Sequence, residues 1–316
     1  MSDTPHLLVP WASSSSPGAL QAWEGLALPH LEKLLSGLSA LPADTQEDES
    51  LSPPHERALG RALGLGDADG RIGFAALHAA ALGLATPPGS GWAFVAPCHW
   101  QVRTDHVTLS DPAALHLSDE ESRAYMHLLA PWFAEDGITL VFDQATRWLA
   151  HGAPLLDASS ASLDRVLQRD VRAWMPSGDA AAPLRRLHSE MQMLLYTHAL
   201  NDAREARRAT PVNAFWLYGT GALGAAQPRR AWPLVSDALR ERALNENWAA
   251  WRNAWQALDG GPVAQLAAQA ASGAAVQITL CGERSALSWH SAPRSLGQRI
   301  SSFLRPQRTS SLREQL

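Results

Sequence analysis

Short apolar runs alternate with stretches of helical periodicity along most of this chain, and this alternation constrains the fold more than any other feature. The strand-like runs lie at residues 6–10, 92–109, 138–142, 212–218 and 276–281. Between them, apolar residues recur at intervals of three and four, most clearly at residues 20–38, 53–64, 72–84, 163–174, 184–195 and 248–258. Because strands that alternate with amphipathic helices build layered domains, the sequence predicts an α/β protein.

The composition limits the classes of protein that the chain can represent. Hydrophobic residues make up 46% and charged residues 18% of 316 residues, which is typical of a globular protein with a large core. A formal charge of -5 gives no reason to expect nucleic acid as a partner. Cys98 and Cys281 are the only cysteines, which favours a reducing compartment. We find no signal-peptide pattern and no run of about 18 apolar residues, and we expect a cytoplasmic protein without membrane contact.

Two features indicate segment boundaries. The pattern changes from helical to strand-like at Gly91, and residues 176–183 are rich in Gly, Ala and Pro. Between them, Ser118 and Glu121 form a capping box that starts a helix, and residues 138–149 read as a hairpin. The sequence thus predicts a first part of a core at residues 1–90, an inserted α+β subdomain at 91–180, a second part of the core at 181–304, and a flexible tail at 305–316.

Two further local signals predict helices. Ser52 followed by Pro53 is typical of an N-cap and a first helical residue. Residues 296–304 carry apolar residues at helical spacing, which predicts a short amphipathic helix before the tail.

Thirteen tryptophans are many for a chain of this length. Trp248, Trp251 and Trp255 lie three and four residues apart on a predicted helix, which favours a place in the core. Tryptophans that remain exposed would anchor a protein partner instead.

The densest polar cluster in the sequence spans residues 98–106. His99, Asp105 and His106 are residue types that bind a divalent metal such as zinc. On one extended strand, however, His99 and Asp105 share a face that His106 does not. A metal site and a polar wall that lines a cleft are therefore both open, and no full ligand set for a metal cofactor is apparent.

A second polar cluster surrounds the end of the helix predicted at residues 184–195. His198, Asn201, Asp202 and Arg204 fall where that helix ends, so they form either one side of a pocket or a solvated helix terminus. The stretch at residues 219–224 matches the G-x-G-x-x-G pattern after a strand, which occurs both in dinucleotide sites and in tight turns.

Two segments carry a resemblance to a known family. Tyr196-Thr197-His198-Ala199-Leu200-Asn201-Asp202-Ala203-Arg204 and Pro211-Val212-Asn213-Ala214-Phe215-Trp216-Leu217-Tyr218-Gly219-Thr220-Gly221 resemble part of the archaeal-type cofactor-independent phosphoglycerate mutases. Most of the chain is also similar to a proteobacterial, phosphoglycerate-mutase-like family named after a regulatory protein of a pathogenicity-factor gene cluster (RpfE-type).

The resemblance implies an alkaline-phosphatase/phosphoglycerate-mutase-like α/β core with an inserted α+β subdomain. It also implies a site with two divalent metals and a serine or threonine nucleophile. This sequence departs from that pattern, because its first strand leads into Pro10-Trp11-Ala12 where the family has Asp-Gly. Ala199 replaces the family's proline, and His290 is the only histidine after His198. A degenerate member of the family is therefore expected.

Our leading hypothesis is a regulatory protein that binds a phosphorylated or anionic small molecule or a protein partner, with no catalytic residue assigned. The candidate ligand-binding residues are Arg103, Asp105, His106, His198, Asn201, Arg204 and Asn213. One alternative is a metal-dependent phosphotransferase or phosphatase with a site rebuilt around His99, Asp105 and His106. A protein-interaction module is the other alternative.

Overall fold

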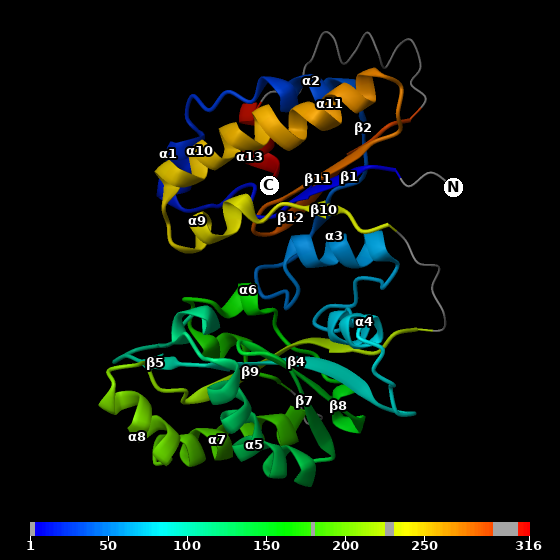
Figure 1. Cartoon of the computed structure of the whole chain (residues 1–316). Coiled ribbons are helices and arrows are strands. Elements are labelled where there is room, and N and C mark those ends of the chain that lie inside the picture. Colours follow the sequence, from blue (N-terminus) through cyan, green and yellow to red (C-terminus); the bar gives the residue numbers. More distant parts are fainter. Residues whose placement is uncertain (1–3, 178–180, 225–230, 293–308) are drawn as a thin grey trace. The chain divides into compact units, whose positions relative to one another are not determined.

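The computed structural model describes residues 4–177, 181–224, 231–292 and 309–316, and the chain divides into two compact units (Figure 1). The smaller unit comprises residues 1–48, 53–64 and 228–316, and the larger comprises residues 49–52 and 65–227. The larger unit therefore extends on both sides of the insertion predicted at residues 91–180. The predicted helix at 296–304 lies outside the described residues.

A mixed β-sheet forms the centre of the smaller unit. Its strands follow the order β10-β1-β11-β12-β2, and β3 pairs with β12. The strand β1 lies parallel to both β10 and β11, whereas β12 is antiparallel to β11. The strands are β1 (His6–Val9), β2 (Ser39–Ala40), β3 (Asp44–Thr45), β10 (Leu234–Val235), β11 (Gln277–Cys281) and β12 (Ser285–His290).

Alternating residues of β1 divide the interior of the smaller unit into two cores. Leu7 and Val9 belong to a large apolar core with the helices α1, α2, α10 and α11, whereas Leu8 packs with Ala58 of α3 on the other face. This is the period of two that a strand buried on both faces requires. The helices are α1 (Pro17–Trp23), α2 (Pro29–Gly37), α3 (Pro54–Leu63), α9 (Arg240–Leu244), α10 (Trp248–Leu258), α11 (Ala264–Ala271) and α13 (Thr309–Gln315), with helical turns η5 (Asp237–Leu239) and η6 (Asp259–Val263).

An antiparallel sheet organises the larger unit. Its strands, labelled in Figure 1, follow the order β7-β8-β4-β9, and β5 pairs with β6 in a separate hairpin. One face of the sheet contacts α5 and α7 in a large apolar core, and the other face contacts α4. The strands are β4 (Gly91–Cys98), β5 (Trp100–Val102), β6 (Val107–Leu109), β7 (Ile138–Gln144), β8 (Arg147–Gly152) and β9 (Ala214–Gly221). The helices are α4 (Phe74–Ala81), α5 (Asp119–Glu135), α6 (Leu163–Val166), α7 (Ala182–Tyr196) and α8 (Ala199–Ala206), with turns η1 (Pro112–Leu115), η2 (Ala153–Leu155) and η3 (Val171–Trp174).

Several local predictions are confirmed and others need correction. The capping box of Ser118 and Glu121 starts α5 as predicted. Ser52, by contrast, does not cap α3, because its hydroxyl oxygen accepts a hydrogen bond from the backbone N–H of Gly70 at 2.8 Å. The helix predicted at residues 163–174 is split into α6 and η3. Within the predicted flexible tail, residues 309–315 form α13 and Leu312 is fully buried in the core.

The tryptophan side chains are mostly internal. Trp251 and Trp255 of α10 and Trp23 of α1 pack edge to face or tilted, with ring centroids 5.6 to 6.2 Å apart. Trp132 and Trp232 are exposed. None of the described helices combines the length and apolar character that a bilayer-crossing segment requires.

Candidate functional site

Three partly buried polar side chains converge on the face of the larger unit's sheet that α4 contacts. His78 lies on α4, Asp143 near the end of β7, and Arg147 at the start of β8. The two strands form a hairpin in which Gln144 pairs with Arg147, so the hairpin turn brings Asp143 and Arg147 together. We call His78, Asp143 and Arg147 the His78 cluster.

The carboxylate of Asp143 is shared by the two other members of the cluster. The Nε of Arg147 donates to Oδ2 at 2.8 Å, and its Nη2 lies 2.7 Å from the same oxygen. The Nε2 of His78 lies 3.1 and 3.2 Å from the two oxygens. Burial raises the pKa of Asp143, but the hydrogen bonds from His78 and Arg147 and their charges outweigh it and leave that pKa below its ordinary value. Asp143 is therefore ionised at neutral pH.

Arg147 retains hydrogen-bonding capacity. Its side chain is 27% exposed, and its guanidinium carbon lies 4.8 Å from the centroid of the Phe94 ring. Asp143 and His78 engage Nε and Nη2, whereas Nη1 has no partner in the part of the chain that the structure describes. A guanidinium has five N–H donors in a fixed plane, so the two on Nη1 are available to a ligand.

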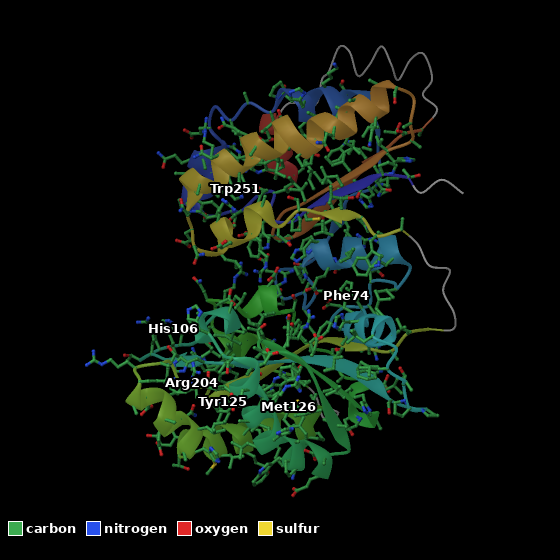
Figure 2. All side chains as sticks on the ribbon, viewed as in Figure 1. Phe74, His106, Tyr125, Met126, Arg204 and Trp251 are labelled. Carbon is green, nitrogen blue, oxygen red and sulfur yellow. The ribbon has the colours of Figure 1, made fainter. Side chains whose placement is uncertain are left out.

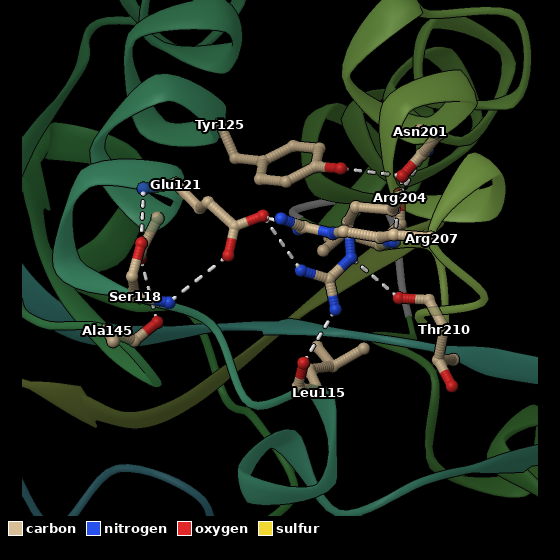
Figure 3. Close-up of polar contacts among 11 residues, drawn as sticks. Leu115, Ser118, Glu121, Tyr125, Ala145, Asn201, Arg204, Arg207 and Thr210 are labelled. Carbon is tan, nitrogen blue, oxygen red and sulfur yellow. Dashed lines mark hydrogen bonds and ion pairs between the residues drawn. The ribbon is translucent and has the colours of Figure 1, made fainter.

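Arg204, a predicted ligand-binding residue, is engaged at every nitrogen (Figure 3). Its Nε donates to the carbonyl oxygen of Thr210 at 2.7 Å, Nη1 to Glu121 at 3.2 Å, and Nη2 to the carbonyl oxygen of Leu115 at 2.6 Å. The side chain is only 2% exposed. Arg204 thus joins α8 to the start of α5 and to the loop before β9.

Asn201, another predicted ligand-binding residue, is buried and fully hydrogen-bonded. Its Oδ1 accepts from the Tyr125 hydroxyl at 2.7 Å and from the backbone N–H of Val212 at 2.9 Å. Its Nδ2 donates to the carbonyl oxygens of Leu195 and Val212, both at 2.8 Å. These four bonds use the whole capacity of an amide side chain. Burial raises the pKa of Tyr125 to about 12, which keeps its hydroxyl protonated as the donor.

Two further predicted ligand-binding residues hold the backbone in place. Asn213 bonds both the N–H and the carbonyl oxygen of Trp100, at 2.7 and 2.9 Å, and so connects the segment before β9 to β5. His198 is the N-cap of α8, where its Nδ1 accepts from the backbone N–H of Leu200 at 3.2 Å.

Arg103, Asp105 and His106 belong to the turn between β5 and β6, where Figure 2 labels His106. The Nδ1 of His106 lies 2.6 Å from Asp105, and Arg172 donates to the Asp105 carbonyl oxygen. The hydrogen bond from His106 is the main reason why the pKa of the exposed Asp105 is lowered. The structure therefore brings these three together at the surface, apart from the buried side chains of Asn201 and Arg204.

The three residues proposed for a metal do not form a common ligand set. The Nδ1 of His99 lies 2.9 Å from the carbonyl oxygen of Pro211, whereas Asp105 and His106 pair at the hairpin turn. Across the described ranges, no three His, Cys, Asp or Glu side chains come together as a metal site.

The glycine-rich motif after β9 serves close packing. Gly221 has a φ of +130°, and a Cβ there would lie 2.9 Å from the Arg71 carbonyl oxygen and 3.0 Å from Gly73. A Cβ on Gly219, where φ is +63°, would lie 2.8 Å from the Phe94 ring. The chain forms no helix from Ala222 to Gly224, where a dinucleotide site needs one to begin.

The sequence interpretation missed the His78 cluster. Its members are 65 and 4 positions apart along the chain, and His78 lies in a run of alanines without a motif. The only available signal was the position of Asp143 and Arg147 on either side of the predicted hairpin turn.

The comparisons with known proteins give a distant likeness. No family model matches the sequence, and no curated protein matches it significantly. The structure resembles a cofactor-independent phosphoglycerate mutase from Thermoplasma acidophilum with a TM-score of 0.37 and 12% identity, covering 92% of this chain and 91% of that chain. It also resembles the PH0037 protein from Pyrococcus horikoshii with a TM-score of 0.41 and 11% identity, covering 92% of this chain and 88% of that chain. At such low scores and identities, the likeness assigns no residue role and no activity to this chain.

Proposed function

We propose that this chain is a regulatory protein that binds a small anion at Arg147 in the His78 cluster. The observation that carries the proposal is the state of the Arg147 guanidinium, which is partly buried and fixed on Asp143 while Nη1 remains available. Arginine is well suited to carboxylate and phosphate, because its planar N–H groups match their oxygens. Partial burial strengthens such a contact by lowering the local dielectric constant.

We also propose that the chain belongs to the RpfE-type family and descends from a mutase-like ancestor without keeping its phosphoryl-transfer site. The turn after β1, where the mutase family has Asp-Gly, supports this proposal. Here the indole N–H of Trp251 donates to the carbonyl oxygen of Trp11 at 3.0 Å, and that of Trp255 donates to Ala12 at 3.2 Å. Tryptophan side chains thus fix the backbone where the family would present a metal ligand.

Calorimetric titration with acetate and with inorganic phosphate, in a chloride-free zwitterionic buffer, tests the anion site. We expect Arg147→Gln to weaken binding about 10- to 100-fold, because a hydrogen bond to a charged group contributes about 1.5–3 kcal/mol. Arg123→Gln is the matched control, since Arg123 is exposed and also lies over an aromatic ring, 3.6 Å from the centroid of Phe142.

A second control distinguishes the His78 cluster from the hairpin turn. Arg103 is exposed and is one of the ligand-binding residues that the sequence predicts. If Arg103→Gln abolishes binding while Arg147→Gln leaves it unchanged, the anion site lies at the β5–β6 turn and the present proposal is wrong.

The phosphotransferase alternative has its own test. Elemental analysis of the purified, untagged protein would show about two equivalents of divalent metal per chain if a two-metal site exists. That result would support the enzyme rather than the anion-binding protein.

A further inference from the structure

Three partly buried side chains lie on the elements that carry the His78 cluster or against the Phe94 ring that Arg147 contacts. Phe74 lies one helical turn before His78 on α4, and Val141 lies two residues before Asp143 on β7. Residues four apart on a helix, or two apart on a strand, share a face. The ring of Tyr218 lies 5.2 Å from that of Phe94, the ring that the Arg147 guanidinium also contacts. We call Phe74, Val141 and Tyr218 the apolar rim.

The apolar rim rests on a buried apolar cluster. Trp92, Phe94 and Leu149 form its floor together with the alanines of α4, and the three rim residues pack against it without being fully covered. The charged and the apolar surfaces therefore meet at Phe94, whose ring centroid lies 5.6 Å from that of His78. The Arg147 guanidinium therefore lies beside the aromatic carbon atoms of Phe94.

The charges of the cluster favour one negative charge on the ligand. Arg147 is positive and Asp143 is negative, so a dianion at Nη1 would lie near a fixed carboxylate and be repelled by it. A monoanionic carboxylate meets less repulsion, and its oxygens can accept hydrogen bonds from the N–H donors of Nη1.

We infer that the ligand is an aromatic carboxylate, whose carboxylate binds Arg147 Nη1 and whose ring packs on the apolar rim. This inference rests on the proposed anion site and names its ligand class. The ring would gain contact with Phe74 and Tyr218, and aromatic pairs contribute beyond the effect of burial alone.

Titration of the intact chain with benzoate, acetate and inorganic phosphate tests the inference. Burial of one face of a phenyl ring predicts that benzoate binds about tenfold more tightly than acetate, which corresponds to about 1.4 kcal/mol. Phosphate should bind more weakly than benzoate. Phe74→Ala should reduce the ratio of benzoate to acetate affinity, and Phe74→Leu, which keeps an apolar side chain without the flat ring, should reduce it less. Leu82→Ala is the control, because Leu82 is 52% exposed beyond the end of α4.

The outcomes separate this inference from the proposed function. If acetate binds in an Arg147-dependent manner and benzoate binds no more tightly, the aromatic ligand class is wrong and the anion site stands. If phosphate binds more tightly than benzoate, the ligand class is wrong as well. If none of the three anions depends on Arg147, the proposed function itself fails. Thermal unfolding of each variant confirms that it is folded under the titration conditions.

Discussion

Three arginines of this chain show how the surroundings of a residue decide its role. Arg204 is buried and donates from every nitrogen, whereas Arg147 is partly exposed and keeps Nη1 available. Arg252 donates to the carbonyl oxygen of Ala22 in the last turn of α1 and to those of Glu24 and Gly25, which follow the helix. The same side chain thus serves as a buried connector, a candidate ligand contact and a helix cap.

Replacement of Arg204 tests its structural role. Arg204→Gln leaves the carboxylate of Glu121 with one arginine, Arg207, and deprives the carbonyl oxygens of Leu115 and Thr210 of their donor. Loss of one partner of a buried charged network costs about 3–5 kcal/mol, so we expect the free energy of unfolding to fall by about 3 kcal/mol in urea denaturation. Arg103→Gln, at an exposed site, should change it by less than about 0.5 kcal/mol. Equal stability of the two variants would contradict this account of Arg204.

The sequence could not distinguish these residues, because their roles depend on contacts between distant segments. Arg204 and Asn201 lie in the segment that carries the family resemblance, so the sequence favoured a ligand-binding role for both residues. The partners that bury them come from α5 and from the loop before β9. The His78 cluster has no motif and is created by the register of the β7–β8 hairpin and by the packing of α4.

At the scale of single elements, local signals predicted structure well where the chain satisfies its own hydrogen bonds. The capping box at Ser118 is such a case. The prediction failed at Ser52 because its hydroxyl oxygen accepts from Gly70, which is distant in the chain. It failed at residues 309–315, where the local sequence is polar, because burial of Leu312 in the apolar core stabilises the helix.

The packing of α7 on β9 leads us to predict how the free energy of unfolding depends on pH below neutrality. His188 of α7 is 2% exposed and stacks on Phe215 of β9, with ring centroids 4.3 Å apart. Burial lowers the pKa of His188 from 6.5 to about 4, so the imidazole is neutral in the folded protein at neutral pH. The unfolded chain binds a proton below pH 6.5, whereas the folded chain does so only near pH 4. The contribution of neutral, buried His188 to the free energy of unfolding is therefore complete above pH 6.5 and is lost as the pH falls toward 4.

Urea denaturation across this pH range measures the effect. The wild-type free energy of unfolding should fall by about 1.4 kcal/mol per pH unit from this residue. His188→Phe keeps a flat ring against Phe215 without the titration, so the difference between the two proteins should change with pH. Burial also lowers the pKa of His6 to about 4, but that residue is common to both proteins and cancels. Parallel pH curves would show that His188 does not titrate as proposed.

At the scale of the whole molecule, the alternation of strands and helices predicted the α/β class, and the structure has this mixed architecture. The division into two units was harder to predict from the sequence. The strand β9 lies far along the chain from β4, β7 and β8 but joins their sheet. A linear division of the sequence at residues 91 and 180 could not anticipate that pairing. The candidate site lies within one unit, so its geometry follows from that unit's own sheet and helix.

The most direct test of the central claim is an NMR titration that follows the arginine side-chain N–H signals while acetate is added. Signals are assigned by their loss in Arg103→Gln, Arg147→Gln and Arg204→Gln. The account predicts that the Arg147 signals shift with a saturable dependence on acetate, while those of Arg204 stay unchanged because its nitrogens are engaged within the protein. A saturable shift at Arg103 or Arg204 without one at Arg147 would contradict the assignment of the anion site to the His78 cluster.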